Sequence, residues 1–288
     1  MRLDVVIVTY RSATYLPVCL EALSNDAHVV VVENASGDDA PELAETAGAK
    51  VVRNATNRGF AAAANQGASM GSGEVVLFLN PDAVVGEADL SKLVTTLESD
   101  EELAAVGPRL VSPDGVEQRP WWAFPSPSST WLEALGLHRV RRWAEADGQG
   151  FVVGACMLVR RSALDEVDGF DERFWLYGEE ADLCRRLWGA GWTVRLVSEA
   201  TALHIGGASG ETVSDVTFEH FQRGAEHFIA KHHGRWGLLS HRLGLLVGSA
   251  LRLPVLVLRG DRRAALRRKM VVRLLRQLAS HPFEVARP

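Results

Sequence analysis

Four short apolar runs in the first hundred residues constrain the fold most strongly. Helical patterns separate them, near Thr14–Ser24, Asp39–Ala47 and Phe60–Met70. Buried strands that alternate with helices are typical of a parallel α/β sheet. Right-handed crossovers bring the carboxyl ends of such strands to one edge, where ligands bind. The runs predicted as strands are Val5–Val8, His28–Val32, Lys50–Val52 and Val75–Leu79.

Polar residues follow three of these predicted strands. They are Thr9-Tyr10-Arg11, Glu33-Asn34 and the turn Asn80-Pro81-Asp82. Proline ends a strand because it fixes its own φ and lacks a backbone donor. The Asp82 carboxylate can belong to ordinary turn chemistry, or it can hold a hard divalent cation beside a diphosphate. The residues alone leave both interpretations open.

The later part of the chain is less regular. Several prolines and tryptophans in residues 108–150 predict a loop-rich insertion with one short helix near Ser128–Leu137. Beyond about Thr212 the pattern is helical. Between these regions we expect a buried strand over Gly150–Arg161, a helix over Glu179–Trp192, and two short strands over Thr193–Val197 and Thr201–Ile205.

The C-terminal part is basic, whereas the chain as a whole is acidic. Twelve Lys and Arg residues and two acidic residues lie between Arg235 and the end, although the formal net charge is −5. The apolar run Leu243–Leu258 contains Arg252 and Pro254, and it is shorter than the roughly 20 residues of a membrane span. A basic amphipathic helix follows. We expect these helices to lie on an anionic membrane surface; a hairpin packed on the body and an oligomer contact are the alternatives.

Composition narrows the class of protein. Hydrophobic residues make up 47% and charged residues 23%, as in a globular protein with a sizeable core. Three widely spaced cysteines favour neither a disulfide framework nor a Cys-rich zinc site, so we expect a reducing compartment. Because Met1 leads almost directly into a strand, we expect no signal peptide and a cytosolic protein. No Gly-x-Gly-x-x-Gly or Gly-Lys-Ser/Thr motif occurs, which excludes the standard dinucleotide and ATPase sites.

Two further clusters could carry chemistry. Glu179, Glu180 and Asp182 begin a predicted helix, where carboxylates complement the helix dipole. The aromatic segment before them resembles a pocket wall, beside which a carboxylate can serve as a general base. His204 ends a predicted strand before a glycine-rich loop, and it can be structural or a ligand. The small side chains of "NRGFAAAANQG" (57–67) allow close approach of a neighbouring helix or of a nucleotide sugar.

Together these segments resemble family 2 glycosyltransferases in sequence and in order. The segments are "VVIVTYRS", "VVENASGDD", "NRGFAAAANQG", "LFLNPDA", "GACMLVRRSALDEVDGFDERFWLYGEEADLCRRL" and "HIGGAS". The resemblance covers about residues 3–210 and points to the bacterial rhamnosyltransferase and galactofuranosyltransferase-like branch. It implies an α/β GT-A fold over residues 1–210. The nucleotide-sugar half would span about 1–107 and the acceptor half about 108–210, with a helical basic extension over 211–288.

The resemblance also implies roles for single residues. Asp82 and His204 would hold Mg²⁺ or Mn²⁺, with Asn80 in place of the first acid of an Asp-x-Asp-type motif. Glu180 would be the catalytic base, with Glu179 and Asp182 in the same motif. Acceptor contacts would come from Trp175 and Tyr177. Nucleotide-sugar contacts would come from Thr9, Tyr10, Arg11, Glu33, Asn34, Asn57, Arg58, Gly59, Asn65 and Asn80.

The implied reaction is an inverting transfer from a nucleoside diphosphate sugar, with dTDP-rhamnose as the leading donor. The acceptor would be a hydroxyl of a glycan or lipid-linked molecule in cell-envelope or polysaccharide synthesis. We expect a peripheral protein at the inner face of the cell membrane, without a nucleic-acid partner; a homo-oligomer stays open. A nucleotidyltransferase should carry a Gly-rich basic loop that "VTYRSATYL" lacks. A non-catalytic binding or partner subunit is the second alternative, and Asn80 favours it.

Overall fold

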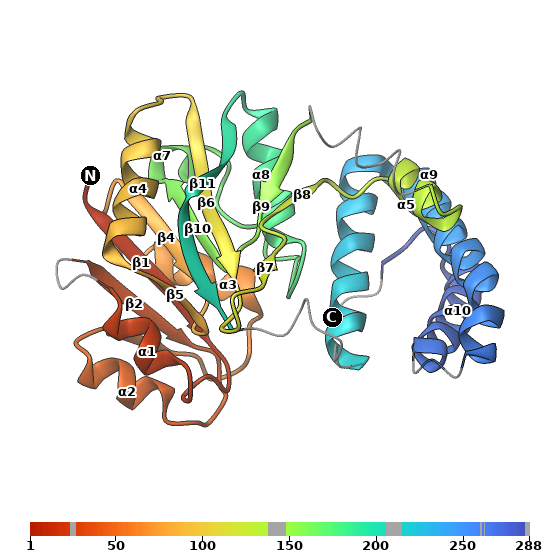
Figure 1. Ribbon diagram of the computed structural model, residues 1–288, viewed down its shortest axis with the longest axis horizontal. Coiled ribbons are helices and arrows are strands. Elements are labelled where there is room, and N and C mark those ends of the chain that lie inside the picture. Colours follow the sequence, from red (N-terminus) through yellow and green to blue (C-terminus); the bar gives the residue numbers. More distant parts are fainter. Residues whose placement is uncertain (24–26, 138–147, 206–214, 260, 262, 286–288) are drawn as a thin grey trace. The chain divides into compact units, whose positions relative to one another are not determined.

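The structure is a computed structural model that describes residues 1–23, 27–137, 148–205, 215–259, 261 and 263–285 (Figure 1). The chain divides into two compact units. The first unit contains residues 1–122 and 149–213, and the second contains 123–148 and 214–288. In this division one break falls between residues 213 and 214, and residues 123–148, which were expected in the acceptor half, group with the C-terminal helices.

The described part of the first unit contains a nine-stranded mixed sheet in the order β3-β2-β1-β4-β10-β6-β11-β5, with β7 paired to β6 (Figure 1). A separate two-stranded sheet joins β8 (Trp121–Ala123) to β9 (Gly150–Val152). The strands of the large sheet are β1 (Leu3–Thr9), β2 (His28–Glu33), β3 (Lys50–Arg53), β4 (Val75–Leu79), β5 (Ala83–Val85), β6 (Leu103–Val111), β7 (Glu117–Gln118), β10 (Cys156–Arg160) and β11 (Thr193–His204).

The parallel half of the sheet confirms the α/β prediction. Strands β3, β2, β1 and β4 run parallel, and every residue of β4 is buried. Burial on both faces explains why these strands are continuous apolar runs. The helices α1 (Leu16–Glu21), α2 (Ala40–Thr46) and α3 (Phe60–Ala68) follow the first three strands and are shorter than the predicted ranges.

The small face of α3 packs on the sheet, a contact that differs from both predicted partners, a neighbouring helix and a nucleotide sugar. All four alanines in the first turns of α3 are buried. A Cβ on Gly67 would lie 2.5 Å from Val6 Cγ1 and 3.1 Å from Val32 Cγ2. The helix therefore approaches β1 and β2 closely, and the small residues serve this contact with the sheet.

The second half of the sheet differs from the prediction in three ways. The single strand expected over Gly150–Arg161 is two strands, β9 and β10, in different sheets. The two strands expected after Trp192 are one strand, β11, with a register shift between Val197 and Thr201. Strands β5 and β6 and the helices α4 (Glu87–Glu98) and α7 (Arg161–Glu166) were not predicted. The helix predicted over Glu179–Trp192 is present as α8 (Glu179–Gly189).

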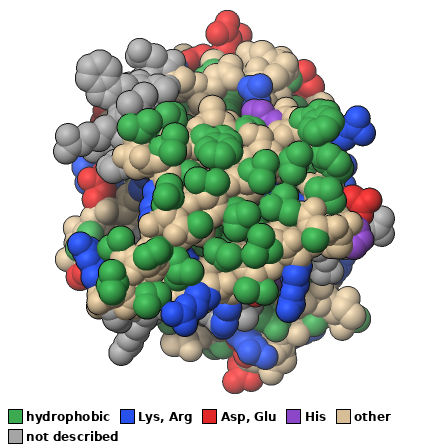
Figure 2. Space-filling view, turned by 90° about the vertical axis from the view of Figure 1, so that its right-hand side faces the viewer, with side chains coloured by type: hydrophobic (Ala, Val, Ile, Leu, Met, Phe, Trp, Pro, Cys, Tyr) green, Lys and Arg blue, Asp and Glu red, His purple; other side chains and the backbone are tan. Residues whose placement is uncertain are grey.

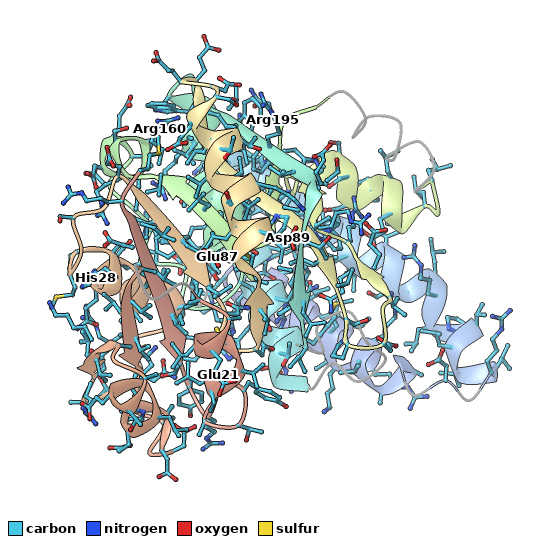
Figure 3. The ribbon with its side chains drawn as sticks, turned by 60° about the vertical axis from the view of Figure 1, so that its left-hand side comes forward. Glu21, His28, Glu87, Asp89, Arg160 and Arg195 are labelled. Carbon is cyan, nitrogen blue, oxygen red and sulfur yellow. The ribbon has the colours of Figure 1, made fainter. Side chains whose placement is uncertain are left out.

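Arginines hold the sheet at the edge opposite the carboxyl ends of β1–β4. Arg160 donates to the backbone oxygens of Leu97, Asp100 and Leu103, and Arg195 donates to Asp100 Oδ2 at 2.6 Å (Figure 3). The Arg160 bonds satisfy carbonyl groups at and after the C-terminal end of α4. The arginines at this edge of the sheet therefore stabilise the fold.

The second unit is helical, as predicted for the C-terminal part. Helix α5 (Pro127–Ala134) packs against α9 (Asp215–Leu258), which is followed by α10 (Arg263–Ser280). Gly234 interrupts α9 with a φ of 67°, a conformation that glycine adopts without a Cβ clash. Arg242 is fully buried, pairs with Glu226 at 2.7 Å, and donates to the backbone oxygens of His281 and Glu284.

Apolar side chains remain exposed on the second unit. Figure 2 shows them across the middle of one face, with Lys and Arg side chains along its lower edge. By length and composition alone, Thr217–Leu258 could cross a membrane, and 28% of its most apolar stretch is buried. The exposed apolar residues of α9 and α10 include Leu243, Leu251, Val255, Val257, Leu258, Val272 and Leu275.

Candidate active site

Backbone strain concentrates at the carboxyl edge of the parallel strands. Four described residues other than glycine have a positive φ, and two of them, Arg11 and Ala35, follow β1 and β2. A third, Tyr177 with a φ of 67°, precedes α8. Such conformations cost free energy and occur preferentially at functional sites. The edge predicted to bind a ligand is therefore also the edge where the backbone is constrained.

Asp82 and His204 lie side by side because two strands pair there. Strand β5 begins directly after Asp82, and Ala83 pairs with His204 of β11. The Ile205 N–H donates to the Asp82 backbone oxygen at 3.0 Å. The Asp82 Oδ1 to His204 Nε2 distance is 3.6 Å. The two side chains that sequence analysis assigned to a metal site are thus neighbours.

The distance between Asp82 and His204 allows both side chains to bind one divalent cation. A separation of 3.6 Å is too long for a hydrogen bond. Two atoms that each lie about 2.1 Å from one ion are at most about 4.2 Å apart, so both can bind the same ion. Burial lowers the pKa of His204 against the opposing charge of Asp82, which favours the neutral imidazole that metals need. No cluster of three or more His, Cys, Asp or Glu ligands occurs among the described residues.

Glu179 and Glu180 form the second part of the site, at the first turn of α8. Gly178, with a φ of 92°, caps this helix, and its N–H donates to Glu180 Oε2 at 3.2 Å. Burial raises the pKa of Glu180. Burial and the neighbouring Glu180 charge raise the pKa of Glu179 well above its usual value. A carboxylate with a raised pKa is a better proton acceptor near neutral pH, as a general base requires.

A short stretch of backbone connects the two parts. The Asn80 N–H, two residues before Asp82, donates to the Ala155 backbone oxygen at 2.9 Å. A Cβ on the adjacent Gly154 would lie 3.5 Å from Glu180 Cβ. This stretch lies in the break between β9 and β10, where one strand was predicted. The break therefore brings the Asp82 turn and Glu180 to the same region.

Tyr177 is close to both parts. Burial, followed by the charges of Glu179, Glu180 and Asp82, raises the pKa of its phenol. Its half-buried side chain therefore shares one region with all three carboxylates. This position is compatible with the acceptor contact that the resemblance implies for Tyr177.

Several predicted nucleotide contacts are internal contacts in the structure. Asn34 is buried, donates to the Gly59 backbone oxygen, and accepts from the Arg58 N–H and the Asn54 amide. Asn57 Oδ1 accepts from the Gly59 N–H at 2.9 Å. These bonds shape the turn before α3. Asn34 and Asn57 hold this turn in place, and their predicted contact with a nucleotide stays a prediction.

Asn65 joins α3 to the segment before α8. Its Oδ1 accepts from the Phe170 N–H at 2.8 Å, and its Nδ2 donates to the Phe170 backbone oxygen at 2.8 Å. In the same region the Phe60 N–H donates to the Trp175 backbone oxygen at 2.7 Å, and a Cβ on Gly59 would lie 2.5 Å from that oxygen. Asn65, Gly59 and Trp175 thus hold the loop that leads to Glu180.

The remaining predicted residues divide by exposure. Thr9 is fully buried, and Glu33 is buried and accepts from the Ser36 N–H and hydroxyl. Tyr10 and Arg11 are exposed and lie against each other, with 5.4 Å between the guanidinium carbon and the ring centre. These two side chains are placed to meet a ligand from solvent.

Asp182 has a supporting position. It is fully buried and accepts from Arg186 Nε at 2.8 Å. Arg186 also donates to the Val167 backbone oxygen, so the ion pair ties α8 to the end of α7. The pair stabilises the helix that carries Glu180.

Sequence reasoning missed Gln118 and Gly154. Gln118 Nε2 lies 2.8 Å from the His204 backbone oxygen, and Gln118 Oε1 lies 2.8 Å from His204 Nδ1. A Cβ on Gly154 would lie 3.5 Å from Glu180 Cβ. Gln118 is 86 residues from His204, in a loop-rich segment without periodicity. No local pattern in the sequence could have identified it.

Comparisons with known proteins identify the family of the chain. Residues 4–168 match the family described as Glycosyl transferase family 2, and residues 144–206 match the one described as N-terminal domain of galactosyltransferase. The chain is 30% identical over 307 residues to N-acetylglucosaminyl-diphospho-decaprenol L-rhamnosyltransferase from Mycobacterium tuberculosis, covering 93% of this chain and 96% of that protein. It is also 30% identical over 139 residues to a rhamnosyltransferase from Escherichia coli, covering 46% and 52%.

Solved structures support the fold. The chain is similar to the mannosyltransferase PcManGT from Pyrobaculum calidifontis, crystallised with GDP-Man and Mn²⁺, with a TM-score of 0.62 at 16% identity over 97% of this chain and 87% of that one. Glucosyl-3-phosphoglycerate synthase from Mycobacterium tuberculosis gives a TM-score of 0.59 at 17% identity over 80% and 79%. These likenesses establish a GT-A-like fold. Because the family match spans more than half of the chain, the protein belongs to glycosyl transferase family 2 and is a glycosyltransferase.

Proposed function

We propose that the protein transfers a sugar from a nucleoside diphosphate sugar to an acceptor hydroxyl, with inversion at the anomeric carbon. Glu180 accepts the hydroxyl proton while the oxygen bonds to the anomeric carbon from the face opposite the diphosphate. The bond to the diphosphate oxygen breaks, and the nucleoside diphosphate leaves. The observation that carries this proposal is the Asn80–Ala155 bond and the Gly154–Glu180 contact, which connect the Asp82–His204 pair to Glu180.

Asp82 and His204 would hold Mg²⁺ or Mn²⁺ in this reaction. A bound divalent cation would act there as a Lewis acid that stabilises charge on the departing diphosphate. General base assistance of the kind assigned to Glu180 contributes typically about 10²–10⁴-fold in rate. Tyr10, Arg11 and Arg58 are exposed residues among the predicted nucleotide contacts, and Trp175 and Tyr177 would face the acceptor.

The donor sugar is inferred from the relatives. Two of them are named rhamnosyltransferases, and one of these acts on a decaprenol diphosphate carrier and aligns over 93% of this chain. We therefore assign rhamnose as the transferred sugar, dTDP-rhamnose as the donor and a lipid-linked glycan as the acceptor, in polysaccharide or cell-envelope synthesis.

The assay that tests this uses the purified full chain, a panel of dTDP, UDP and GDP sugars, and a short polyprenyl diphosphate N-acetylglucosamine. We expect transfer from dTDP-rhamnose only, lost with EDTA and restored by Mn²⁺, with NMR showing inverted configuration in the product. Retained configuration would contradict the role of Glu180 as a base. Transfer that persists in EDTA would contradict the metal assignment.

A membrane-bound acceptor would require the enzyme to reach the bilayer, and the second unit supplies a suitable surface. Exposed apolar side chains on α9 and α10 are accompanied along the chain by exposed basic residues, which include Arg259, Arg268 and Arg276. Apolar residues can enter the interface while basic residues meet anionic headgroups. We assign this face to the cytoplasmic leaflet, which makes the protein cytoplasmic and peripheral.

Vesicle sedimentation tests the membrane assignment. Replacing Arg259, Arg268 and Arg276 with Gln should weaken binding to phosphatidylglycerol vesicles by about 3 kcal/mol, or roughly 100-fold, at about 1 kcal/mol for each charge. The matched control replaces Lys50, Lys92 and Arg109, exposed residues of the first unit, and should bind as the wild type does. Equal loss in both triple variants would mean that net charge, and not this face, drives binding.

A further inference from the structure

Gln118 makes two contacts with His204. Gln118 Nε2 donates to the His204 backbone oxygen at 2.8 Å, and Gln118 Oε1 lies 2.8 Å from His204 Nδ1. We propose that Gln118 is a positioning residue that keeps the proton of His204 on Nδ1, so that Nε2 faces Asp82 as a ligand for a divalent cation. This inference rests on the metal site of the proposed function.

The orientation of the amide follows from hydrogen-bond chemistry. A backbone carbonyl oxygen can only accept, so the end of the amide that faces the His204 carbonyl must be the NH₂ group. The other end, Oε1, is an acceptor and faces Nδ1. A short contact of an acceptor with Nδ1 requires a proton on Nδ1. The backbone contact therefore determines the orientation of the amide, and the amide determines the tautomer.

The tautomer decides what Nε2 can do. A neutral imidazole carries one N–H, so a proton on Nδ1 leaves a lone pair on Nε2. Nε2 then faces Asp82 Oδ1, also an acceptor, at 3.6 Å. Two facing acceptors repel unless a cation lies between them. Metal-binding histidines generally donate their other N–H to a neighbouring group, which orients the ring and increases its basicity.

The fold explains how Gln118 reaches His204. Gln118 belongs to the two-residue strand β7, which pairs with β6 at Leu110. Strand β11, which ends at His204, pairs with β6 over the same residues. Pairing of β7 with β6 therefore places a half-buried amide beside the histidine. Its neighbour Glu117 is exposed, which offers a matched control on the same strand.

The first experiment is ¹⁵N NMR on the metal-free full chain, labelled at histidine and recorded at about pH 8. The chain contains nine histidines, and a His204→Gln variant identifies the signals of His204. In the wild type we expect protonated Nδ1 and unprotonated Nε2. Gln118→Met, which lacks the amide, should show a mixture of tautomers. Gln118→Glu keeps an acceptor and should restore the Nδ1–H form, and Glu117→Gln should match the wild type.

The second experiment is a Mn²⁺ titration followed by EPR, with thymidine diphosphate present to supply the remaining ligands. Gln118→Met should bind Mn²⁺ about 10- to 100-fold more weakly, the usual effect of losing a partner of a metal-binding histidine. Gln118→Glu should recover most of the affinity, and Glu117→Gln should keep it.

The outcomes separate this inference from the proposed function. An unchanged tautomer and unchanged Mn²⁺ affinity in Gln118→Met would overturn the inference, whatever the transfer activity. Equal Mn²⁺ affinity of the wild type and His204→Gln would also overturn it. Shifts in the tautomer and the affinity together would support it, even if no sugar transfer were found and the proposed function failed.

Discussion

Strand pairing places Asp82 and His204, whereas a loop held by the Asn65 side chain and one backbone hydrogen bond places Glu180. The pairing of β5 with β11 aligns Ala83 with His204 and leaves Asp82 one residue away. Glu180 follows a segment whose path depends on the two Asn65 bonds to Phe170 and on the Phe60–Trp175 bond. The positions of Asp82 and His204 therefore depend on the strands of the sheet, whereas the position of Glu180 depends on hydrogen bonds between a loop and α3.

The difference predicts how each half responds to change. A strand cannot slip by one residue without turning all its side chains to the other face, so the position of Asp82 relative to His204 is strongly specified. A loop can shift when one side chain is lost. Substitutions outside the site should therefore disturb the position of Glu180 more than that of the Asp82–His204 pair.

The largest expected effect comes from Glu180→Gln. Removing the proton acceptor should lower the rate of transfer by about 10²–10⁴-fold. Donor binding should stay nearly unchanged, because the donor diphosphate is assigned to Asp82 and His204. Single-turnover rates and calorimetric titration with the donor measure the two quantities. Glu101→Gln, on an exposed residue, is the control. Normal turnover in Glu180→Gln would move the base to another residue.

Asp82→Asn should have the next largest effect. Losing one electrostatic contact to the leaving group typically costs about 10²–10³-fold in rate. Higher Mn²⁺ concentrations should recover part of the loss, because the remaining ligand still binds weakly. Transfer rates over a Mn²⁺ series measure this. Since strand pairing sets the site, the Glu180→Gln variant should show the Mn²⁺ dependence of the wild type.

Asn65→Ala should have a smaller effect and distinguishes two roles for Asn65. If it holds the loop, the variant loses about 1–3 kcal/mol of stability, kcat falls roughly 10-fold, and the KM for the donor stays the same. If it contacts the donor instead, as the resemblance implies, the KM should rise and stability should change little. Denaturant unfolding and steady-state kinetics separate the roles, with Gln66→Ala on the same helix as the control.

Glu179→Gln should have the smallest effect, seen as a change in the pH dependence of stability. Burial raises the pKa of Glu179, so its favourable contribution is complete below the ordinary glutamate pKa of about 4.3 and is lost as pH rises through the raised value. A Gln cannot ionise and avoids this loss. We expect equal stability at or below about pH 4, where the glutamate is protonated in both states, and a variant about 1–3 kcal/mol more stable at pH 8, as measured by urea unfolding.

The parallel half of the sheet could be predicted because each strand is a continuous apolar run. Strand β6 could not, because Gly107 and Pro108 in its middle look like a turn. In the structure Gly107 is required by close packing, since a Cβ there would lie 2.9 Å from Val152 Cβ. Strand β11 was predicted as two strands because Ser198 and Glu199 interrupt the apolar pattern, and a register shift absorbs them.

For the candidate site, sequence analysis predicted residues that the structure brings together, but it did not show which of them make internal contacts. Asp82, His204 and Glu180 lie at the predicted edge of the sheet. Asn34 and Asn65 also belong to the segments that resemble family 2 glycosyltransferases. Their side-chain amides, however, form hydrogen bonds with backbone groups of Arg58, Gly59 and Phe170. The role of Gln118 depends on a contact across the sheet, which no local pattern records.

The burial of Arg242 has a practical consequence for shortening the chain. Its guanidinium is neutralised by Glu226 and capped by two carbonyl oxygens near the C-terminal end. A truncation before His281 would keep the ion pair with Glu226 but remove both carbonyls, so the buried guanidinium would lose two hydrogen-bond acceptors at about 1.5–3 kcal/mol each. Removing residues 281–288 would therefore destabilise the remaining helices of the second unit, and point substitutions on their exposed faces disturb this unit less.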